Sequence, residues 1–267
     1  MRAGTIGLAL ALLTGSAQAA PRVFSLDQCA DEFVLALSPR AAIVGLSNRA
    51  DDADSYLADR ARGLPLHRPT AEAVLAAHPG VVVRTWGGDA RLARTLSRRG
   101  VTVVQIGDAN DFNDIRREIR KVAAALGQPA AGEGLIGRMD NQLAASAGAW
   151  HGAGALYLTS GGYTAGGGTL IDAVLRAAGL TNLAGGQGFR PMSAERLVMH
   201  PPSAIVEGFF DRSAASIQNW NPGRLAAVRR VAAGRTVVSL PGTLLGCPGW
   251  FAADAATRIA AARPAKR

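Results

Sequence analysis

A block of helix followed by strand occurs twice in this chain, and the two copies are 123 residues apart. Each copy begins with a hydroxyl residue, Thr70 or Ser193, and a glutamate follows two positions later, at Glu72 or Glu195. Apolar residues, a proline and a pair of β-branched residues then follow at matched positions. A capping hydroxyl and a first-turn acid favour a helix in any protein, so one copy alone says little. The matched spacing of the two copies predicts two similar α/β units.

Between the two units lies an amphipathic segment, residues 128–147, which we expect to form one long helix. Pro129 suits the first turn of a helix, and Gly127 ends the helical pattern before it. The apolar residues recur on one side of a helical repeat: Leu135, Ile136, Met139 and Leu143. About 18 residues at ~1.5 Å each would span roughly 27 Å, the width of a small domain. We therefore predict a helical brace between two lobes that open little on ligand release.

Short apolar runs alternate with helical patterns along the whole chain. The predicted strands are residues 22–26, 42–46, 81–85, 101–106, 155–159, 204–206 and 236–240. The predicted helices are residues 70–77, 89–99, 114–126, 170–178, 194–199, 225–232 and 252–262, besides a helix after Cys29. This alternation predicts an α/β fold with two doubly wound parallel-sheet lobes. We expect an N-terminal lobe over 20–127, the interlobe helix within 128–150 and a C-terminal lobe over 151–267, with residues 47–66 as a polar connection.

Residues 1–19 have the three parts of a secretory signal peptide. Arg2 gives a positive start, residues 6–13 form a short apolar run, and Ala17 and Ala19 are the small residues before a cut after Ala19. The apolar run is too short to cross a bilayer, and no cysteine follows it to carry a lipid. We therefore expect the mature chain in the periplasm.

The formal net charge is +9, and nearly all of the positive charge is arginine, since Lys121 and Lys266 are the only lysines. Such a balance fits nucleic acid, an anionic membrane or an acidic small ligand. Export argues against nucleic acid. The arginines are scattered over predicted helix faces, which is also typical of a generally solvated basic surface.

Cys29 and Cys247 are the only cysteines. In an exported protein such a pair is more often a disulfide than a metal site, because two thiolates do not fill a tetrahedral shell. The sequence leaves open whether the two are bridged. If they are, the bridge would join the two lobes and limit their opening.

Enzyme and metal functions lack the residues that they need. Residues 161–168 form a glycine-rich loop between a strand and a helix, but Gly167 and Gly168 stand where a P-loop has lysine and a hydroxyl residue. Ser160 lacks the preceding glycine of a nucleophile elbow. The four histidines are dispersed, which argues against a three-histidine metal site. From these missing patterns we expect no catalytic residues, no metal site and no cofactor.

The chain resembles the class III periplasmic substrate-binding proteins of ABC importers, which serve cobalamin, ferric siderophores and haem. The resemblance covers essentially the whole mature chain. Its carriers are RVFSLDQCADEFVLAL, AEAVLAAHPGVVV with Trp86 after it, VTVVQIGDANDFNDIRREIRKVAAALGQPAAGEGLI, and GGYTAGGGTLIDAVLRAAGLTNLA with AERLV after it. The order of these segments is more specific than any one of them.

The resemblance implies two α/β lobes with a ligand cleft between them and a partner in the inner membrane. In such proteins a glutamate on each lobe docks into arginine pockets of the two permease subunits, and Glu72 and Glu195 occupy the matching positions. Helices of a doubly wound sheet begin at the carboxyl ends of strands, so both glutamates should stand on the cleft rim. We expect a monomer that binds an ABC permease dimer and no nucleic acid.

Open α/β sheets bind ligands beyond the carboxyl ends of their strands. The resulting candidate cleft residues are Arg84, Trp86, Tyr163, Phe189, Arg190, Phe209, Trp220 and Trp250. Trp86 is the strongest of them, because the family often has tryptophan there and Arg84 could share its direction. Trp86 favours a flat macrocycle, whereas the arginines favour an anionic chelate. The sequence thus predicts a receptor for a corrinoid or a ferric siderophore, with haem or a free metal ion such as zinc as the alternative.

Overall fold

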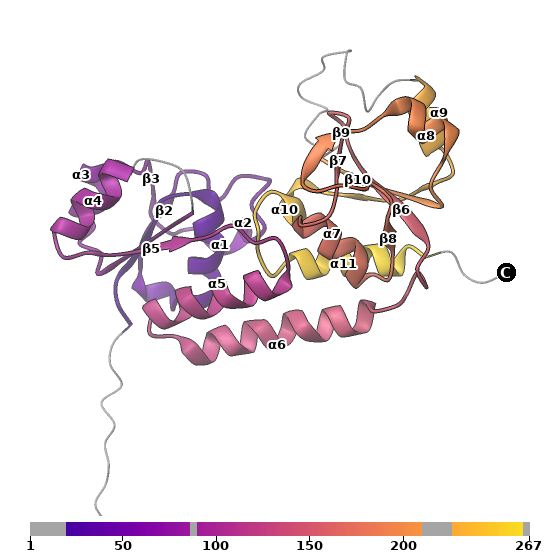
Figure 1. Ribbon diagram of the computed structural model, residues 1–267. Coiled ribbons are helices and arrows are strands. Elements are labelled where there is room, and N and C mark those ends of the chain that lie inside the picture. Colours follow the sequence, from indigo (N-terminus) through magenta and orange to yellow (C-terminus); the bar gives the residue numbers. More distant parts are fainter. Residues whose placement is uncertain (1–19, 86–89, 210–225, 264–267) are drawn as a thin grey trace, which may run out of the picture.

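The structure is a computed structural model that describes residues 20–85, 90–209 and 226–263 (Figure 1). The predicted signal segment and two of the candidate cleft residues, Trp86 and Trp220, lie outside the described residues. Within the described ranges the chain forms two separate α/β units, each built on its own parallel sheet. The predicted fold class is confirmed.

The first lobe is built on a five-stranded parallel sheet in the order β3-β2-β1-β4-β5. Its strands are β1 (Val23–Ser25), β2 (Ile43–Ser47), β3 (Leu66–His67), β4 (Val81–Thr85) and β5 (Thr102–Ile106). Its helices are α1 (Gln28–Leu37), the 3-10 helix η1 (Arg40–Ala42), α2 (Ala58–Ala61), α3 (Ala71–Ala76), α4 (Ala90–Arg98) and α5 (Phe112–Ala125). The strand β4 is buried along almost its whole length, as its run of apolar residues predicts.

The second lobe has a four-stranded parallel sheet in the order β11-β10-β6-β8 and a separate two-stranded antiparallel ribbon of β7 and β9. We call this ribbon the β7–β9 hairpin, although α7 and β8 lie between its strands in the chain. Its strands are β6 (Gly154–Thr159), β7 (Tyr163–Ala165), β8 (Thr181–Asn182), β9 (Phe189–Pro191), β10 (Ala204–Gly208) and β11 (Thr236–Leu240). Its helices are α7 (Leu170–Ala177), α8 (Ala194–Met199), α9 (Ala226–Ala232), α10 (Gly242–Leu245) and α11 (Ala252–Ala261).

The helix α6 (Pro129–Ser146) lies in the chain between the two sheets and packs on α5 of the first lobe and α11 of the second (Figure 1). Its buried residues include Leu135, Ile136 and Met139. A Cβ on Gly132 would lie 2.6 Å from the Cβ of Ala123, so glycine allows α5 and α6 to approach closely. One hydrophobic core continues from the first lobe through α6 into the second.

The described helices include none that is both long and apolar enough to cross a bilayer. Every helix and strand that the sequence predicts inside the described ranges is present, with ends that differ by a few residues. The division of the chain at residues 127 and 150 stays a prediction.

The sequence reading of residues 47–66 as a plain connection is incomplete. This segment contains α2 and leads into the edge strand β3. Its middle is held on α1 by Glu32, whose carboxylate accepts hydrogen bonds from the Ser55 hydroxyl at 2.7 Å and from the backbone N–H groups of Tyr56 and Leu57 at 2.7 and 2.9 Å. A polar segment looks like a loop by composition, but a buried carboxylate elsewhere in the chain gives it a fixed shape.

Asp31, the neighbour of Glu32 on α1, is also fully buried. Its carboxylate accepts hydrogen bonds from the backbone N–H and the hydroxyl of Ser47, and so ties α1 to the end of β2. Burial raises the pKa of Asp31 to about 6, and the bonds from Ser47 offset part of that rise. The folded state therefore favours the protonated form of this carboxyl group.

The raised pKa predicts a pH dependence of stability. The contribution of a carboxyl group with a raised folded-state pKa is complete below its unfolded pKa of 3.8 and is lost as pH rises through about 6. We expect D31N to gain stability relative to the wild type, by on the order of 1–3 kcal/mol, between about pH 4 and pH 7. Urea unfolding of both proteins across this range measures the difference. A difference that does not change with pH would contradict the assignment.

Candidate functional site

A pocket of about 330 Å³ lies between the lobes at the carboxyl ends of β5 and β10. The first lobe lines it with Asp108, Ala109 and Asn110. The second lobe lines it with residues of β6, β9, α10 and α11, of α7 and its cap, and of the segments that follow β10 and α10: Tyr157, Thr169, Leu170, Ile171, Val174, Phe189, Phe209, Leu244, Leu245, Cys247, Pro248 and Ala252. This position agrees with the rule that open α/β sheets bind ligands beyond the carboxyl ends of their strands.

The first-lobe wall of the pocket is a loop that two acidic side chains hold in shape. The carboxylate of Glu118, on α5, accepts a hydrogen bond from the N–H of Gly107 at 2.9 Å, and that of Asp114 accepts one from the N–H of Asn110 at 2.9 Å. The bond from Asn110, followed by one from Arg117, lowers the pKa of Asp114. The loop is therefore preorganised without a ligand.

The end of β4 is fixed by a residue that sequence reasoning missed, Asp27. Its carboxylate accepts hydrogen bonds from the N–H and hydroxyl of Thr85, at 2.8 and 2.9 Å, and from the N–H of Ala30 at 3.0 Å as the cap of α1. Arg84 is buried within β4, and its Nε donates to the Thr85 carbonyl at 3.1 Å. Asp27 thus fixes Thr85, the last residue of β4. A helix cap directly after β1 was the available signal in the sequence.

The hairpin of β7 and β9 separates two neighbouring candidates. In the hairpin Thr164 pairs with Arg190, and Ala165 pairs with Phe189, so the two pairs face opposite sides of the ribbon. Phe189 lines the pocket between the lobes and is 63% exposed. Arg190 instead lines a different pocket, on the α8 side, and donates to the carbonyl of Ala184. The two therefore do not act on one ligand face.

Tyr163 belongs to the same side of the hairpin as Phe189, because it lies two residues before Ala165 on β7. It is 49% exposed. Phe209 directly follows β10, has a positive φ of 61° and lines the pocket between the lobes. Its carbonyl accepts a hydrogen bond from the Ser160 hydroxyl at 3.4 Å. The structure thus brings Phe189 and Phe209 to one pocket.

Trp250 does not line that pocket but is buried in an aromatic contact between the lobes. Its ring meets Phe33 edge-on, with centroids 5.5 Å apart, and lies 6.3 Å from that of Tyr56. Tyr56 also stacks on Phe251 at 4.6 Å. Phe33 and Tyr56 come from the first lobe, whereas Trp250 and Phe251 come from the second. This aromatic cluster therefore packs the two lobes against each other.

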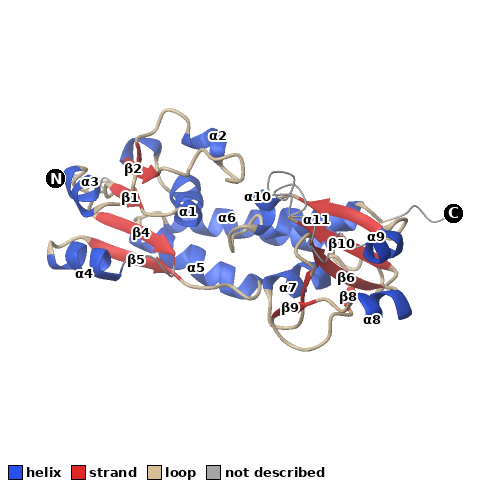
Figure 2. Cartoon of the chain, turned by 90° about the horizontal axis from the view of Figure 1, so that it is seen from above, coloured by secondary structure: helices blue, strands red, loops and turns tan. Residues whose placement is uncertain are grey.

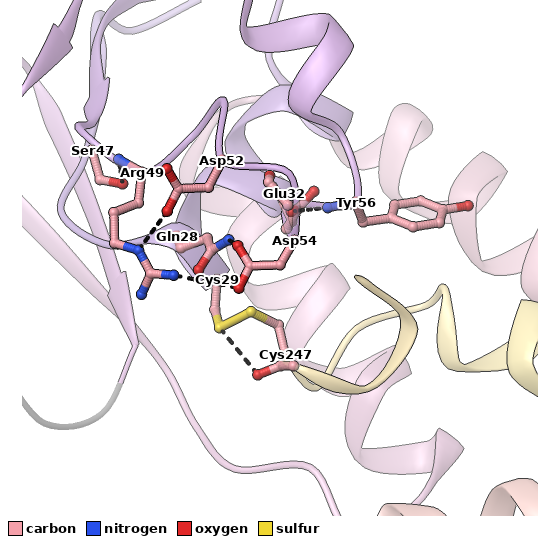
Figure 3. Close-up of polar contacts among 11 residues, drawn as sticks. Gln28, Cys29, Glu32, Ser47, Arg49, Asp52, Asp54, Tyr56 and Cys247 are labelled. Atoms are coloured by element: carbon pink, nitrogen blue, oxygen red, sulfur yellow. Dashed lines mark hydrogen bonds and ion pairs between the residues drawn. A yellow bond between two sulfur atoms is a disulfide. The ribbon is translucent and has the colours of Figure 1, made fainter. Parts of the chain in front are cut away.

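A disulfide and a shared carboxylate also join the two lobes, and Figure 3 shows the disulfide with the polar contacts of the first lobe around it. Cys29 on α1 and Cys247 after α10 are bonded, with their Cα atoms 5.3 Å apart. The hydroxyl of Tyr56 donates to one carboxylate oxygen of Asp254 at 2.5 Å, and the amide of Gln142 donates to the other. Because Gln142 belongs to α6 and Asp254 to α11, one carboxylate holds both lobes and the helix between them.

The two repeated glutamates lie at equivalent places on the two lobes. Glu72 is in the first turn of α3 and Glu195 in the first turn of α8, and both are exposed. The hydroxyls of Thr70 and Ser193 cap these helices, as the repeat predicts. Among the described residues neither glutamate has an ion-pair partner. The described part of the chain also contains no group of three or more His, Cys, Asp or Glu side chains that could hold a metal ion.

Two α/β lobes with a pocket between them are the architecture of a protein that binds a small ligand in a cleft. The sequence profile described as periplasmic binding protein matches residues 23–207, so the chain belongs to the periplasmic binding protein family. Members of this family are periplasmic ligand-binding proteins that work with ABC permeases. A comparison with curated protein sequences gave no match.

Solved structures similar to the chain extend over nearly its whole length. The periplasmic haem-binding protein BhuT, solved with two haems, is 26% identical, with a TM-score of 0.68 over 91% of this chain and 98% of its own. A periplasmic haem-binding protein from Pseudomonas aeruginosa is also 26% identical, with a TM-score of 0.66 over 91% of this chain and 92% of its own. The vitamin B12-binding protein BtuF of Vibrio cholerae shares the fold at 18% identity, with a TM-score of 0.61 over 91% and 96%.

The disulfide predicts a loss of stability when it is removed. A cross-link between residues 218 positions apart restricts the unfolded chain strongly, so C29S/C247S should lose about 2–4 kcal/mol of unfolding free energy. Urea unfolding under non-reducing conditions measures this loss, and mass spectrometry of the unreduced wild type shows the intact bridge. Equal unfolding midpoints for the two proteins would contradict the prediction.

Proposed function

We propose that the protein is the receptor of an ABC importer that captures haem in the cleft and delivers it to an inner-membrane permease. It performs no chemistry on its cargo. Ligand affinity and the docking of the two lobes on the permease constitute the mechanism. The observation that carries the proposal is the exposed aromatic face of the β7–β9 hairpin beside the pocket between the lobes.

Haem is a flat apolar macrocycle that carries two carboxylates, and it needs an aromatic or apolar surface together with positive charge. Phe189 is 63% exposed and lines the pocket, so its ring is available to a ligand there. Tyr163 on the same side of the hairpin adds a second ring. The net charge of +9 suits an anionic ligand. The 26% identity to two haem-binding proteins supports the same ligand.

The ligand is tested by titration with haem, cobalamin and several ferric siderophores, followed by protein fluorescence and visible absorbance. We expect saturable haem binding at micromolar concentration or below. Saturation by cobalamin or a ferric siderophore alone would keep the receptor function and replace its ligand. Cobalamin and ferric siderophores remain the second candidate ligands, because the vitamin B12-binding protein BtuF has the same fold. The geometry of the cleft does not require a ligand that contains iron. Stoichiometric binding of free zinc would instead support a metal-ion receptor.

The hairpin predicts a specific loss of affinity. F189A removes an exposed ring at the pocket, and we expect haem affinity to fall by roughly tenfold, the usual effect of truncating an aromatic anchor. M199A is the matched control, because Met199 on α8 is 68% exposed but does not line the pocket. Equilibrium titration of both variants decides the matter. Equal affinities for F189A and M199A would exclude the hairpin from the ligand site.

The permease contact is proposed for Glu72 and Glu195. Each carboxylate is exposed in the first turn of a short helix, without an ion-pair partner among the described residues, and the two occupy matched positions in the repeat. An exposed acid that is not used within its own lobe can pair with an arginine of a partner. The family to which the chain belongs works with such permeases.

Replacing both docking glutamates predicts a separation of transport from binding. We expect E72A/E195A to abolish permease-dependent uptake while haem affinity stays unchanged, because neither residue lines the pocket. The control is E133A, which removes an exposed acid from α6, where Glu133 pairs with Arg120. Uptake assays and haem titration on the same preparations give both readouts. Lost haem affinity in E72A/E195A would contradict the assignment of these glutamates to permease docking.

A further inference from the structure

The exposed basic side chains differ in their partners from one helix to another. All four basic residues of α5 are ion-paired with acids. The helices α4 and α9 contain no acidic residue at all. Five exposed arginines on or directly after these helices have no carboxylate within ion-pair distance among the described residues: Arg94 and Arg98 of α4, Arg99 just after it, and Arg229 and Arg230 of α9. Positive charge is thus neutralised along α5 and left open on α4 and α9, as it also is at single exposed arginines elsewhere in the described part of the chain, such as Arg138 on α6.

The arginines of α4 and those of α9 occupy equivalent positions on the two lobes. The helix α4 packs on α3, which carries Glu72, and α9 packs on α8, which carries Glu195. Figure 2 shows the pair α3 and α4 at one end of the molecule and the pair α8 and α9 at the other. We call these four the rim helices. Each proposed docking glutamate therefore has a neighbouring helix with unpaired arginines.

The arginines point away from the core by helix geometry. On α4 the buried residues are Leu92 and Leu96, and Arg94 and Arg98 lie two positions after each, on the opposite side of the helix. On α9 the buried residues Val228 and Ala232 leave Arg229 and Arg230 outside. Like charges four residues apart destabilise a helix, so Arg94 and Arg98 do not serve the stability of α4.

We propose that the unpaired arginines of α4 and α9 bind anionic phospholipid headgroups of the inner membrane on either side of the docked permease. A guanidinium group matches phosphate oxygens in geometry and charge. Arginines near an anionic bilayer each add to its attraction, and both groups act on one rigid body. The orientation rests on the proposed docking of Glu72 and Glu195, since the lipid that surrounds a permease would meet the flanks of that contact.

The test uses the full mature protein and bare vesicles, so that it does not depend on the permease or on haem. The probe is vesicles with about 30 mol% phosphatidylglycerol in phosphatidylcholine, against pure phosphatidylcholine. We expect co-sedimentation with the anionic vesicles only, and its loss in about 0.5 M NaCl, where surface charges are screened.

Two charge-matched variants separate a local site from the overall charge. The rim variant is R94Q/R98Q/R229Q/R230Q. The control variant is R60Q/R120Q/R138Q/R258Q, which removes four exposed arginines from α2, α5, α6 and α11. We expect the vesicle affinity of the rim variant to fall at least tenfold, since each arginine at an anionic surface contributes about a fivefold factor. The control variant should stay within about twofold of the wild type.

Equal losses in the two variants, or no binding of the wild type to anionic vesicles, would overturn the proposal. Binding only to vesicles that contain the permease would assign the arginines to the permease and not to lipid. Haem titration of the rim variant should give wild-type affinity, and E72A/E195A should still bind the anionic vesicles. These readouts keep a failure of the lipid contact distinct from a failure of the receptor function.

Discussion

The carboxylate of Asp254 is the contact on which the arrangement of the two lobes depends. It accepts a hydrogen bond from Tyr56 of the first lobe and from Gln142 of the interlobe helix, while itself belonging to the last helix of the second lobe. Both of its oxygens are used across the junction. The ring of Tyr56 stacks on that of Phe251, with centroids 4.6 Å apart, and burial raises the pKa of Tyr56. The phenol therefore stays a hydrogen-bond donor over the whole physiological range.

A junction of this kind limits how far the two lobes can move apart. The hydrophobic core is continuous from one sheet to the other, and opening the lobes widely would expose part of it to water. The disulfide between Cys29 and Cys247 fixes a second point beside the pocket, because Cys247 lines it. Capture therefore depends on surfaces that exist before the ligand arrives, such as the loop held by Glu118 and Asp114.

Sequence periodicity predicts the parts of this fold that a single local pattern specifies. The apolar period of residues 128–147 and the buried run of β4 each identify an element, because burial is repeated at the spacing of helix or strand. Periodicity does not predict the β7–β9 hairpin, since its strands are only three residues long and lie within glycine-rich sequence. The two strands are also separated in the chain by a helix. The sequence predicts Trp250 as a cleft residue, whereas its ring packs on Phe33 and Tyr56. These partners are distant in sequence, so no local pattern indicates the contact. Such contacts exist only once the lobes have met.

The distribution of charge follows the same division between local and distant effects. On α5 acids stand within one turn of the basic residues or on the adjacent helix, so Arg117 meets Asp114 and Arg120 meets Glu133. On α4 and α9 the sequence supplies no acid, and Glu72 and Glu195 project from the helices beside them. An exposed arginine costs little in water, so folding does not require this difference. The proposed contacts outside the chain would explain it, since a protein docked through Glu72 and Glu195 alone, as proposed, would have only two fixed points and could rotate about the line that joins them. Arginines beside each point would oppose that rotation if they meet the surrounding bilayer.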